Sequence, residues 1–387
     1  MVNIFCVNTQ TSKSFDEGHS LLDILNSFAP DFERPYPILA AKVNNVCQGL
    51  KYRAFNSRQV QFLDYTSYAG SSVYCSSLCF LLCKAARDLW PECKLTLRRP
   101  ISKGYFCALN KGGDSVLTQA DVDALNARMQ ELVDADLAFR RYEVKTDEAI
   151  AMFEQMGYND KVKLLQTSGD VYVNYYMLED TADYYYEALV PSTGYLKVWN
   201  LTLYKGGMLL RVPDRHKPEQ LAPFTEQSKT FEVFSENVRW NKIMGLDNVG
   251  DVNIACQKGE APDLIKIAEA LQEKKIVQIA EEIERRMNDE SNPLKLVLIT
   301  GPSSSGKSTF CKLVCGFENP QNGKIFFKKE DITENSIRRR AAHIGYVMQN
   351  PNQMISKVKI FDEVALGLRN RGVSEDEIKG RVEGTLK

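Results

Sequence analysis

The residues most able to do chemistry lie in Gly301-Pro-Ser-Ser-Ser-Gly306-Lys307-Ser308, which satisfies the pattern G-x-x-x-x-G-K-[ST] completely. The glycines let the backbone curl around a β-phosphate with its N–H groups pointing inward. Lys307 is expected to bridge the β- and γ-phosphates, and the Ser308 hydroxyl to be a ligand of Mg²⁺. We predict an ATP and Mg²⁺ site, with nucleotide contacts from Gly301, Pro302, Ser303, Ser304, Ser305, Gly306, Lys307, Ser308 and Thr309.

The elements on either side of this loop are those that a phosphate loop needs. The apolar run KLVLIT predicts a strand before it, and STFCKLVCGF predicts a helix after it. A glycine turn that only joins a strand to a helix would not require a lysine at position 307. The setting therefore favours nucleotide binding.

Phosphoryl transfer also needs a further metal ligand and a group that orients the acceptor or water. The segment HIGYVMQ (343–349) predicts a strand that ends at Gln349, which could touch Mg²⁺ or orient water, or could simply cap the strand. No acidic residue after Ser308 ends an apolar strand, so turnover by this chain alone is not expected. The carboxylates considered are Asp331, Glu334, Asp362 and Glu363.

Composition places few limits on partners. The chain has 387 residues, 44% of them hydrophobic, and a net charge of -1, so neither nucleic acid nor anionic lipid is favoured globally. The apolar runs LVLIT and LCFLL are far shorter than the ~20 residues that span a bilayer, and the N-terminus lacks the pattern of a signal peptide. We expect a cytoplasmic protein without a transmembrane segment.

Ten cysteines are present, and three of them, Cys75, Cys79 and Cys83, recur at helical i, i+4 spacing. A metal or redox cluster is one interpretation. Zinc sites usually pair cysteines two to four apart on a turn and need a fourth ligand, so buried reduced thiols on one helix face are the favoured interpretation.

The order of predicted elements indicates a multidomain chain. Residues 1–65 read as strand, helix, strand and further short strands, the order of a β-grasp module. The helix is predicted to start at Ser20, with Asp23 three residues later, and ILAAKVNNV to be a strand that runs into an asparagine turn.

In residues 66–258 we predict an α+β domain, with two or three helices packed on an antiparallel sheet. The helices are expected from about Ser72, from Thr118 as a cap candidate, and over residues 147–157. KLTLRRPISKGYFCAL predicts strand, turn and strand, with Pro100 and Gly104 as punctuation, and alternating aromatic segments such as YYYEALV (184–190) predict further strands. Residues 259–292 predict a connecting helix with an apolar stripe, and residues 293–387 an incomplete α/β P-loop NTPase domain.

Up to about residue 310 the chain resembles bacterial nucleoside kinases of the uridine kinase type, which carry a TGS domain and a domain akin to the second additional domain of threonyl-tRNA synthetases. The resemblance is carried by EGHSLLDIL, CFLLCKAARDLWPECKL, PISKGYFCAL, ALVPSTGYLKVW, FEVFSENVRWNKIMGLDNVGDVN, IKIAEALQEKKIVQIAEEI and KLVLITGPSSSGKSTF. It implies a TGS-like domain over 1–65, a synthetase-like domain over 66–258, and phosphoryl transfer from ATP to a nucleoside.

The resemblance also implies an editing function for the synthetase-like domain, which this sequence does not support. The chain has only three histidines, His19, His216 and His343, and no H-x-x-x-H pair for a metal. We expect an RNA-binding or purely structural role instead, with RNA reached through the TGS-like or synthetase-like domain.

After about residue 312 the resemblance changes. LVCGFENPQNGKIFFKKEDIT, RRRAAHIGYVMQNPNQMI and KIFDEVALGLRNRGVSEDEIKGRVEGTLK look like the ATP-binding subunit of an ABC transporter that serves metal-ion or vitamin uptake. The resemblance covers about residues 301–387 and implies that Gln349 is the glutamine that approaches Mg²⁺ and couples to a membrane subunit. The family's L-S-G-G-Q signature and Walker B aspartate do not occur, nor does the acidic motif of the kinases.

Two incomplete enzymes thus share one phosphate loop, and we expect a hybrid or truncated chain. The main functional prediction is an ATP-binding protein related to uridine kinases. The first alternative is an ATP-binding fragment of an ABC transporter ATPase, and the second is a nucleotide- or RNA-binding module without turnover.

Overall fold

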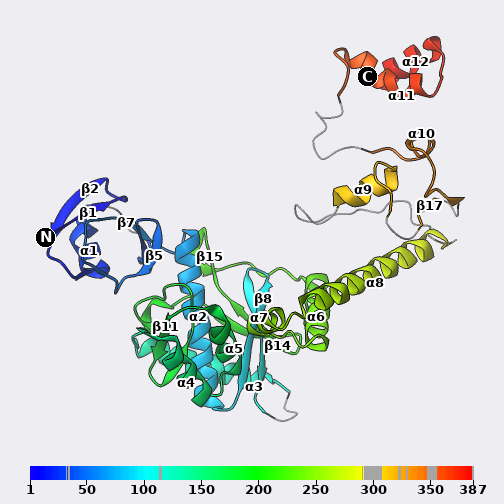
Figure 1. The fold of residues 1–387 in the computed structure, drawn as a ribbon. Coiled ribbons are helices and arrows are strands. Elements are labelled where there is room, and N and C mark those ends of the chain that lie inside the picture. Colours follow the sequence, from blue (N-terminus) through cyan, green and yellow to red (C-terminus); the bar gives the residue numbers. More distant parts are fainter. Residues whose placement is uncertain are drawn as a thin grey trace. The chain divides into compact units, whose positions relative to one another are not determined.

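The computed structural model describes residues 1–31, 33, 35–112, 116–289, 291, 307–320, 324–327, 330–346 and 355–385; for Arg98, Arg99, Glu284 and Lys307 it describes the backbone alone. The chain divides into two compact units, Met1–Gln272 and Glu273–Lys387, and the division falls inside one long helix. Figure 1 gives the order of the elements along the chain.

The N-terminal segment is a five-stranded sheet in the order β2-β1-β7-β4-β5, with one helix, α1, packed on it. Its central strands β1 and β7 are parallel, while the other pairs are antiparallel. Two short strands pair beside it. The elements are β1 (Val2–Cys6), β2 (Thr11–Phe15), β3 (His19–Ser20), α1 (Leu21–Phe28), β4 (Ala40–Val43), β5 (Val46–Gly49), β6 (Arg53–Ala54) and β7 (Arg58–Leu63).

Local sequence explains these boundaries. Ser20 caps α1: its hydroxyl accepts from the Asp23 N–H, and the Asp23 carboxylate accepts from the Ser20 N–H, a capping box visible in the sequence. Asn44 and Asn45 have positive φ angles of 47° and 67°, the left-handed conformation that asparagine tolerates, and they turn β4 into β5.

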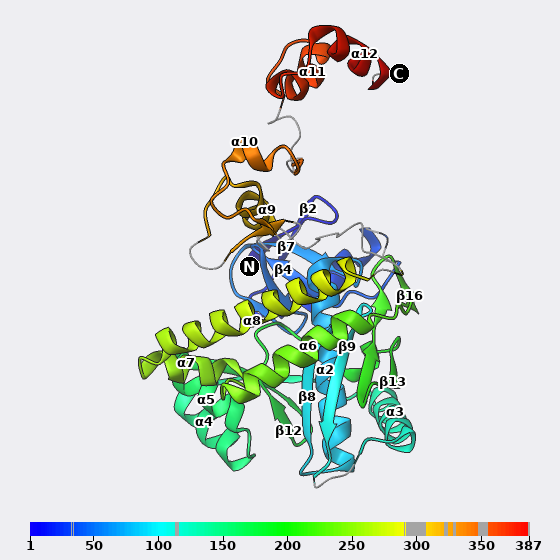
Figure 2. The same cartoon turned by 90° about the vertical axis from the view of Figure 1, so that its right-hand side faces the viewer.

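A four-stranded antiparallel sheet, in the order β13-β14-β9-β8, forms the centre of the next segment. Helix α2 contacts both β8 and α3, and α3 contacts β13; Figure 2 shows these helices beside the sheet. Their apolar faces share one buried cluster that extends from Leu39 to Val212. The elements are α2 (Tyr68–Leu89), β8 (Lys94–Ile101), β9 (Gly104–Asn110), α3 (Gln119–Asp134), β13 (Asn200–Tyr204) and β14 (Gly207–Arg211).

A second, three-stranded sheet has the order β10-β11-β12, and two helices pack on it around the fully buried Phe153. These elements are β10 (Arg140–Lys145), α4 (Thr146–Gln155), α5 (Asn159–Ser168), β11 (Tyr172–Leu178) and β12 (Thr181–Asp183). A hairpin and three helices follow the central sheet: β15 (Pro213–Asp214), β16 (Lys217–Leu221), α6 (Ser228–Ile243), α7 (Val249–Gln257) and α8 (Ala261–Met287).

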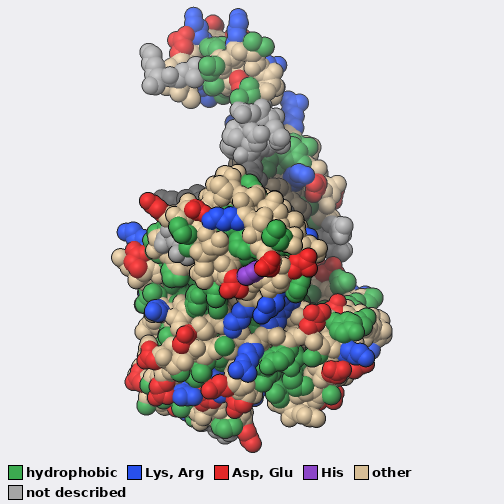
Figure 3. Space-filling model, turned by 90° about the vertical axis from the view of Figure 1, so that its left-hand side faces the viewer, with side chains coloured by type: hydrophobic (Ala, Val, Ile, Leu, Met, Phe, Trp, Pro, Cys, Tyr) green, Lys and Arg blue, Asp and Glu red, His purple; other side chains and the backbone are tan. Residues whose placement is uncertain are grey.

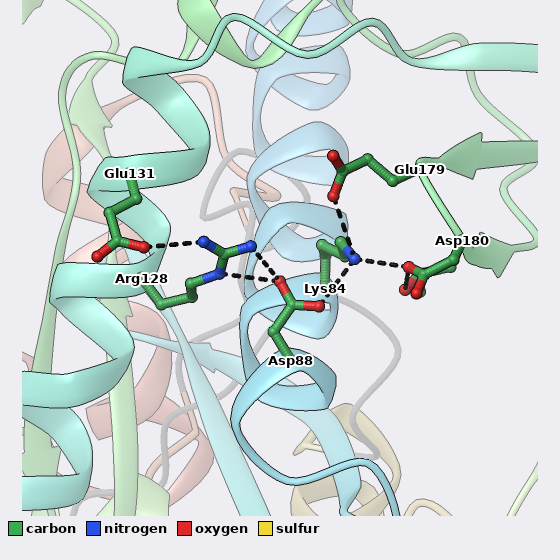
Figure 4. A network of polar contacts seen from close by, with 7 residues as sticks. Lys84, Asp88, Arg128, Glu131, Glu179 and Asp180 are labelled. Carbon is green, nitrogen blue, oxygen red and sulfur yellow. Dashed lines mark hydrogen bonds and ion pairs between the residues drawn. The ribbon is translucent and has the colours of Figure 1, made fainter.

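Lys84 is the charged centre of a network that joins three elements (Figure 4). Its side chain on α2 is 3% exposed and pairs with Asp88 at 2.7 Å and with Asp180, in the β11–β12 turn, at 2.6 Å. Arg128 of α3 pairs with Asp88 at 2.9 Å. Burial opposes the charge on Lys84, but hydrogen bonds to Asp180 and Asp88 raise its pKa overall.

The cysteines of α2 lie in the interior of this unit. Burial raises the pKa of Cys79 and Cys83, which keeps both thiols protonated and unreactive. Across the described ranges, no group of three histidine, cysteine or acidic side chains is placed to hold a metal ion. α2 is also the one helix, of those described, that is long and apolar enough to cross a membrane, but 72% of its apolar window is buried in the fold.

Unit Glu273–Lys387 contains shorter elements: α9 (Lys307–Cys315), β17 (Phe326–Phe327), β18 (Glu330–Asp331), α10 (Ile337–Arg340), α11 (Ile360–Asn370) and α12 (Glu375–Thr385). Ala365, Ile378 and Val382 form a buried cluster between α11 and α12. On the face of the molecule in Figure 3, basic and acidic side chains are interspersed, in keeping with the near-zero net charge.

Several local predictions need correction. Helix α2 begins at Tyr68 with Ser67 as its cap, four residues before the predicted start at Ser72. Pro100 lies within β8 rather than in a turn, and the chain reverses at Ser102 and Lys103. The aromatic run 184–190, predicted as a strand, is irregular. In the described part of residues 66–258 there are six helices, α2 to α7, and of these α2, α3 and α6 contact the central antiparallel sheet.

Candidate functional site

The structure describes only part of the predicted nucleotide site. Gly301, Pro302, Ser303, Ser304, Ser305, Gly306 and Gln349 lie outside the described residues, as does the predicted strand KLVLIT. Lys307 is the first residue of α9, and Ser308 and Thr309 are exposed in its first turn. The predicted helix after the loop therefore forms and begins at the lysine of the motif, which leaves the Ser308 hydroxyl accessible to a metal-bound nucleotide.

The C-terminal end of α9 is held by Arg340, a residue that no sequence motif marked. The Arg340 side chain is 3% exposed, and its Nη1 donates to the carbonyl oxygens of Leu313, at 2.8 Å, and Val314, at 3.1 Å. Helix carbonyls at this end have no intrahelical donor and carry partial negative charge. The guanidinium satisfies two of them and complements that charge.

The same guanidinium also binds the segment that precedes α10. Nη2 donates to the Thr333 carbonyl at 2.5 Å and Nε to the Asn335 carbonyl at 3.0 Å. Gly316, at φ +82°, passes so close that a Cβ there would lie 3.1 Å from the Arg340 side chain. One side chain thus ties the phosphate-loop helix to residues 333–335.

The hairpin of β17 and β18 lies just before this segment. Asp331 pairs with Lys324 at 2.9 Å and accepts hydrogen bonds from the backbone N–H and the hydroxyl of Thr333. The hydrogen bond from the Thr333 hydroxyl is the largest cause, followed by that from Lys324, and together they lower the pKa of Asp331 to about 2. Phe327 stacks on His343, with ring centroids 5.5 Å apart. Residues 343–346 are irregular where a strand was predicted, and residues 347–349 lie outside the described part.

The remaining predicted carboxylates are engaged locally. Glu363 accepts the backbone N–H groups of Ser356, at 2.8 Å, and Lys357, at 2.7 Å, which lowers its pKa. Asp362 pairs with Arg369 at 3.0 Å, and Glu334 is exposed in a turn. In the described part of this unit these side chains do not converge on a common metal position.

Comparison with known families assigns the range of the chain that contains the phosphate loop. The profile of the ABC transporter family matches residues 285–386, about a quarter of the chain, and this range contains the whole phosphate loop, α9, Arg340 and Gln349. The C-terminal part carries an ABC transporter ATP-binding domain. The match begins before residue 301, so both flanks of the phosphate loop, not only its C-terminal side, align with this family.

Individual relatives agree. A candidate ABC transporter ATP-binding protein of Enterococcus faecalis is 53% identical over 92 residues, which cover 24% of this chain and 16% of the relative. One from Clostridium perfringens is 48% identical over 101 residues, which cover 26% of this chain and 18% of the relative. One from Streptococcus agalactiae is 38% identical over 151 residues, which cover 38% of this chain and 27% of the relative.

The chain therefore spans less than a third of the length of these relatives. These matches give no support to the resemblance to uridine kinases or TGS domains, and they favour the ABC alternative over the kinase prediction. The phosphate loop explains the ambiguity, because its residue types are set by the phosphates rather than by the acceptor.

Proposed function

We propose that residues 285–386 bind ATP with Mg²⁺ as part of an ABC-type ATPase domain. The observation that carries the proposal is the complete G-x-x-x-x-G-K-S spacing inside the family match, with α9 beginning at Lys307. Backbone N–H groups of the loop would hold the β-phosphate, Lys307 the β- and γ-phosphates, and Ser308 the metal ion. The exposure of Ser308 and Thr309 fits this assignment.

We further propose that Gln349 approaches the metal ion and that ATP hydrolysis, completed together with segments supplied in the full transporter, is coupled to a membrane subunit at the cytoplasmic face. The names of the bacterial relatives support the coupling to transport. We propose a metal ion or a vitamin as the substance that the transporter takes up.

Isothermal titration of ATP·Mg²⁺ into the full chain tests the proposal. Lys307→Ala should weaken binding roughly 10- to 150-fold, because a hydrogen bond to a charged group contributes about 1.5–3 kcal/mol. Lys312→Ala is the matched control: Lys312 lies in the same helix, is half-exposed, and pairs with Glu318 at 3.1 Å. Equal affinities of the wild type and Lys307→Ala would overturn the proposal.

A second measurement separates the two enzyme classes. Uridine should leave the rate of ADP release unchanged, because an ABC-type site has no nucleoside acceptor. Uridine-dependent ADP release that disappears in Lys307→Ala would restore the nucleoside kinase alternative. ATP binding without ADP release under either condition would favour the module without turnover.

For the N-terminal unit we propose a β-grasp module over residues 1–65 and an α+β domain of the synthetase-like type over 66–258. The parallel central pair β1 and β7, with α1 packed on their sheet, supports the first. The antiparallel sheet under α2 and α3 supports the second. We propose a structural or RNA-binding role, which titration of a structured RNA into residues 1–272 would test.

A further inference from the structure

A partly open pocket of about 350 Å³ lies in the unit Met1–Gln272, away from the phosphate loop in sequence. It is formed by the first two turns of α2, the beginning of β9 and the hairpin of β15 and β16. The lining residues that bear on its chemistry are Tyr65, Tyr68, Cys75, Lys103, Asp214 and Arg215. Nothing in the proposed ATPase function uses this pocket.

The floor of the pocket is apolar and aromatic. Tyr65 and Cys75 are buried, and the Tyr65 hydroxyl donates to the Pro213 carbonyl at 3.0 Å, which fixes the floor to the hairpin. Burial raises the pKa of Cys75, so the thiol is a neutral, apolar wall. At the rim, the ring of Tyr68 is 79% exposed and presents a flat face without burial in the fold.

The charged groups of the lining are at the rim, and cations outnumber anions. Lys103 and Arg215 carry positive charge, and His216 adds a third basic group; Asp214 is the one carboxylate of the lining. Asp214 is already used, since it accepts the His216 backbone N–H at 2.8 Å and pairs with Lys103 at 3.3 Å. The Arg215 guanidinium is exposed and offers planar, bidentate recognition of an anionic group.

Lys103 is held at the rim by its turn. Ser102 and Lys103 have φ angles of +50° and +58°, a left-handed turn that normally favours Asn-Gly. The turn is fixed because the Ser102 N–H donates to the Gln227 side chain at 3.0 Å and the Ser102 hydroxyl accepts the Thr225 N–H at 2.6 Å. The backbone at Lys103 is therefore held in place by the hydrogen bonds of Ser102.

We propose that this pocket binds a small ligand with a planar ring and one anionic group, either a phosphate or a carboxylate. The ring would lie on the aromatic floor and against Tyr68, and the anionic group would be held by Arg215 and Lys103. An apolar cavity with a few polar groups converging at one side is the usual form of a small-molecule site.

Equilibrium dialysis with the full chain tests this, in a Lys307→Ala background that weakens binding at the phosphate loop. The probes are adenosine 5′-monophosphate and 4-hydroxyphenylacetate, with adenosine and inorganic phosphate as the two halves of the first. Adenosine 5′-monophosphate or 4-hydroxyphenylacetate should bind at least tenfold tighter than adenosine or inorganic phosphate. A preference for the nucleotide or for the carboxylate identifies which anionic group the site takes.

Arg215→Ala and Tyr68→Ala should each weaken that binding about tenfold or more. Both side chains are exposed, so the fold should persist, and tryptophan fluorescence during urea unfolding checks this. Lys229→Ala, an exposed lysine of α6 outside the lining, is the control and should bind normally. Absence of binding by both ring-bearing anions at millimolar concentration, equal binding of inorganic phosphate alone, or undiminished binding by either variant would overturn the proposal.

Discussion

The two units differ in what holds their described parts together. In residues 1–272, apolar side chains from strands and helices far apart in sequence share large buried clusters. Among the residues described in 273–387, the apolar cluster lies between α11 and α12, and the helix of the phosphate loop is fixed by the polar contacts of Arg340. Hydrophobic burial scales with area, so mutations should act through cavities in the first unit and through lost hydrogen bonds in the second.

The tryptophans allow the two units to be followed separately. Trp90, Trp199 and Trp240 are the three tryptophans of the chain, and all lie in the first unit. Tryptophan fluorescence therefore reports unfolding of residues 1–272, while amide hydrogen exchange reports both units.

The largest expected effect is that of Phe80→Ala in the first unit. Phe80 is fully buried between the rings of Phe139 and Tyr185, with centroids 5.7 and 5.6 Å away, so truncation leaves a cavity. The free energy of unfolding measured by urea and tryptophan fluorescence should fall by about 3–5 kcal/mol. Phe55→Ala, at a side chain that is 59% exposed, should cost less than about 1 kcal/mol. Equal losses in the two variants would mean that Phe80 is not part of a closely packed core.

Arg340→Met should have the next largest effect, confined to the second unit. It retains the apolar stem but removes the guanidinium donor from four carbonyl groups, of which Leu313 keeps the Gly316 N–H at 3.1 Å, at a cost of about 2–4 kcal/mol. Amides near the end of α9, residues 311–316, should exchange faster, while the tryptophan transition stays unchanged. Arg339→Met is the matched control, since Arg339 is 67% exposed and pairs with Glu330 at 3.3 Å. Unchanged exchange in Arg340→Met would contradict the cap.

Lys84→Met tests the charged network of the first unit. Removing the ammonium takes its partner from Asp180, while Asp88 keeps Arg128, and both carboxylates reach solvent, so the expected loss is about 1–2 kcal/mol by urea unfolding. Lys13→Met breaks a surface pair with Asp31 and should cost less than about 0.5 kcal/mol. A gain in stability in Lys84→Met would show that burying the charge costs more than its ion pairs contribute.

The smallest effect concerns acid stability of the first unit. Hydrogen bonds from Lys111 and then from Thr118 lower the pKa of Asp121 to about 2, against 3.8 ordinarily. A carboxyl group whose pKa is depressed by folding stabilises the fold above its unfolded pKa, and this contribution is lost as the pH falls from about 4 to about 2. Asp121→Asn should therefore flatten the acid limb of the stability curve. Asp123→Asn, an exposed aspartate of the same helix, should leave that limb as steep as in the wild type.

Features of this fold that depend on neighbouring residues could be predicted from the sequence, whereas features that depend on contacts between distant residues could not. The helix starts at Ser20 and Thr118 and the turn at Asn44 and Asn45 depend on neighbouring residues, and the structure confirms them. The aromatic run 184–190 alternates like a strand, but its chain is used as a connection whose backbone bonds to side chains such as Ser77. Helix α5 was missed because its apolar positions are sparse.

The candidate site shows the same division. The spacing around Lys307 predicted the nucleotide site, because phosphate recognition fixes residue types at short range, and whether its loop adopts the expected form stays a prediction. The role of Arg340 could not be predicted, since it depends on carbonyl groups 26 and 27 residues earlier in the chain. It is the last of three successive arginines, and nothing in the sequence distinguishes it from Arg338 and Arg339.

Arg340 has a consequence for how this part of the chain tolerates substitution. Its four acceptors are main-chain carbonyls, so the side chains at positions 313, 314, 333 and 335 do not provide the contact. Those positions can vary without loss of the cap, whereas lysine at 340 has a single nitrogen and cannot reach all four oxygens. Position 340 should therefore require arginine, whereas the cap itself sets no requirement on the side chains at its four partner positions.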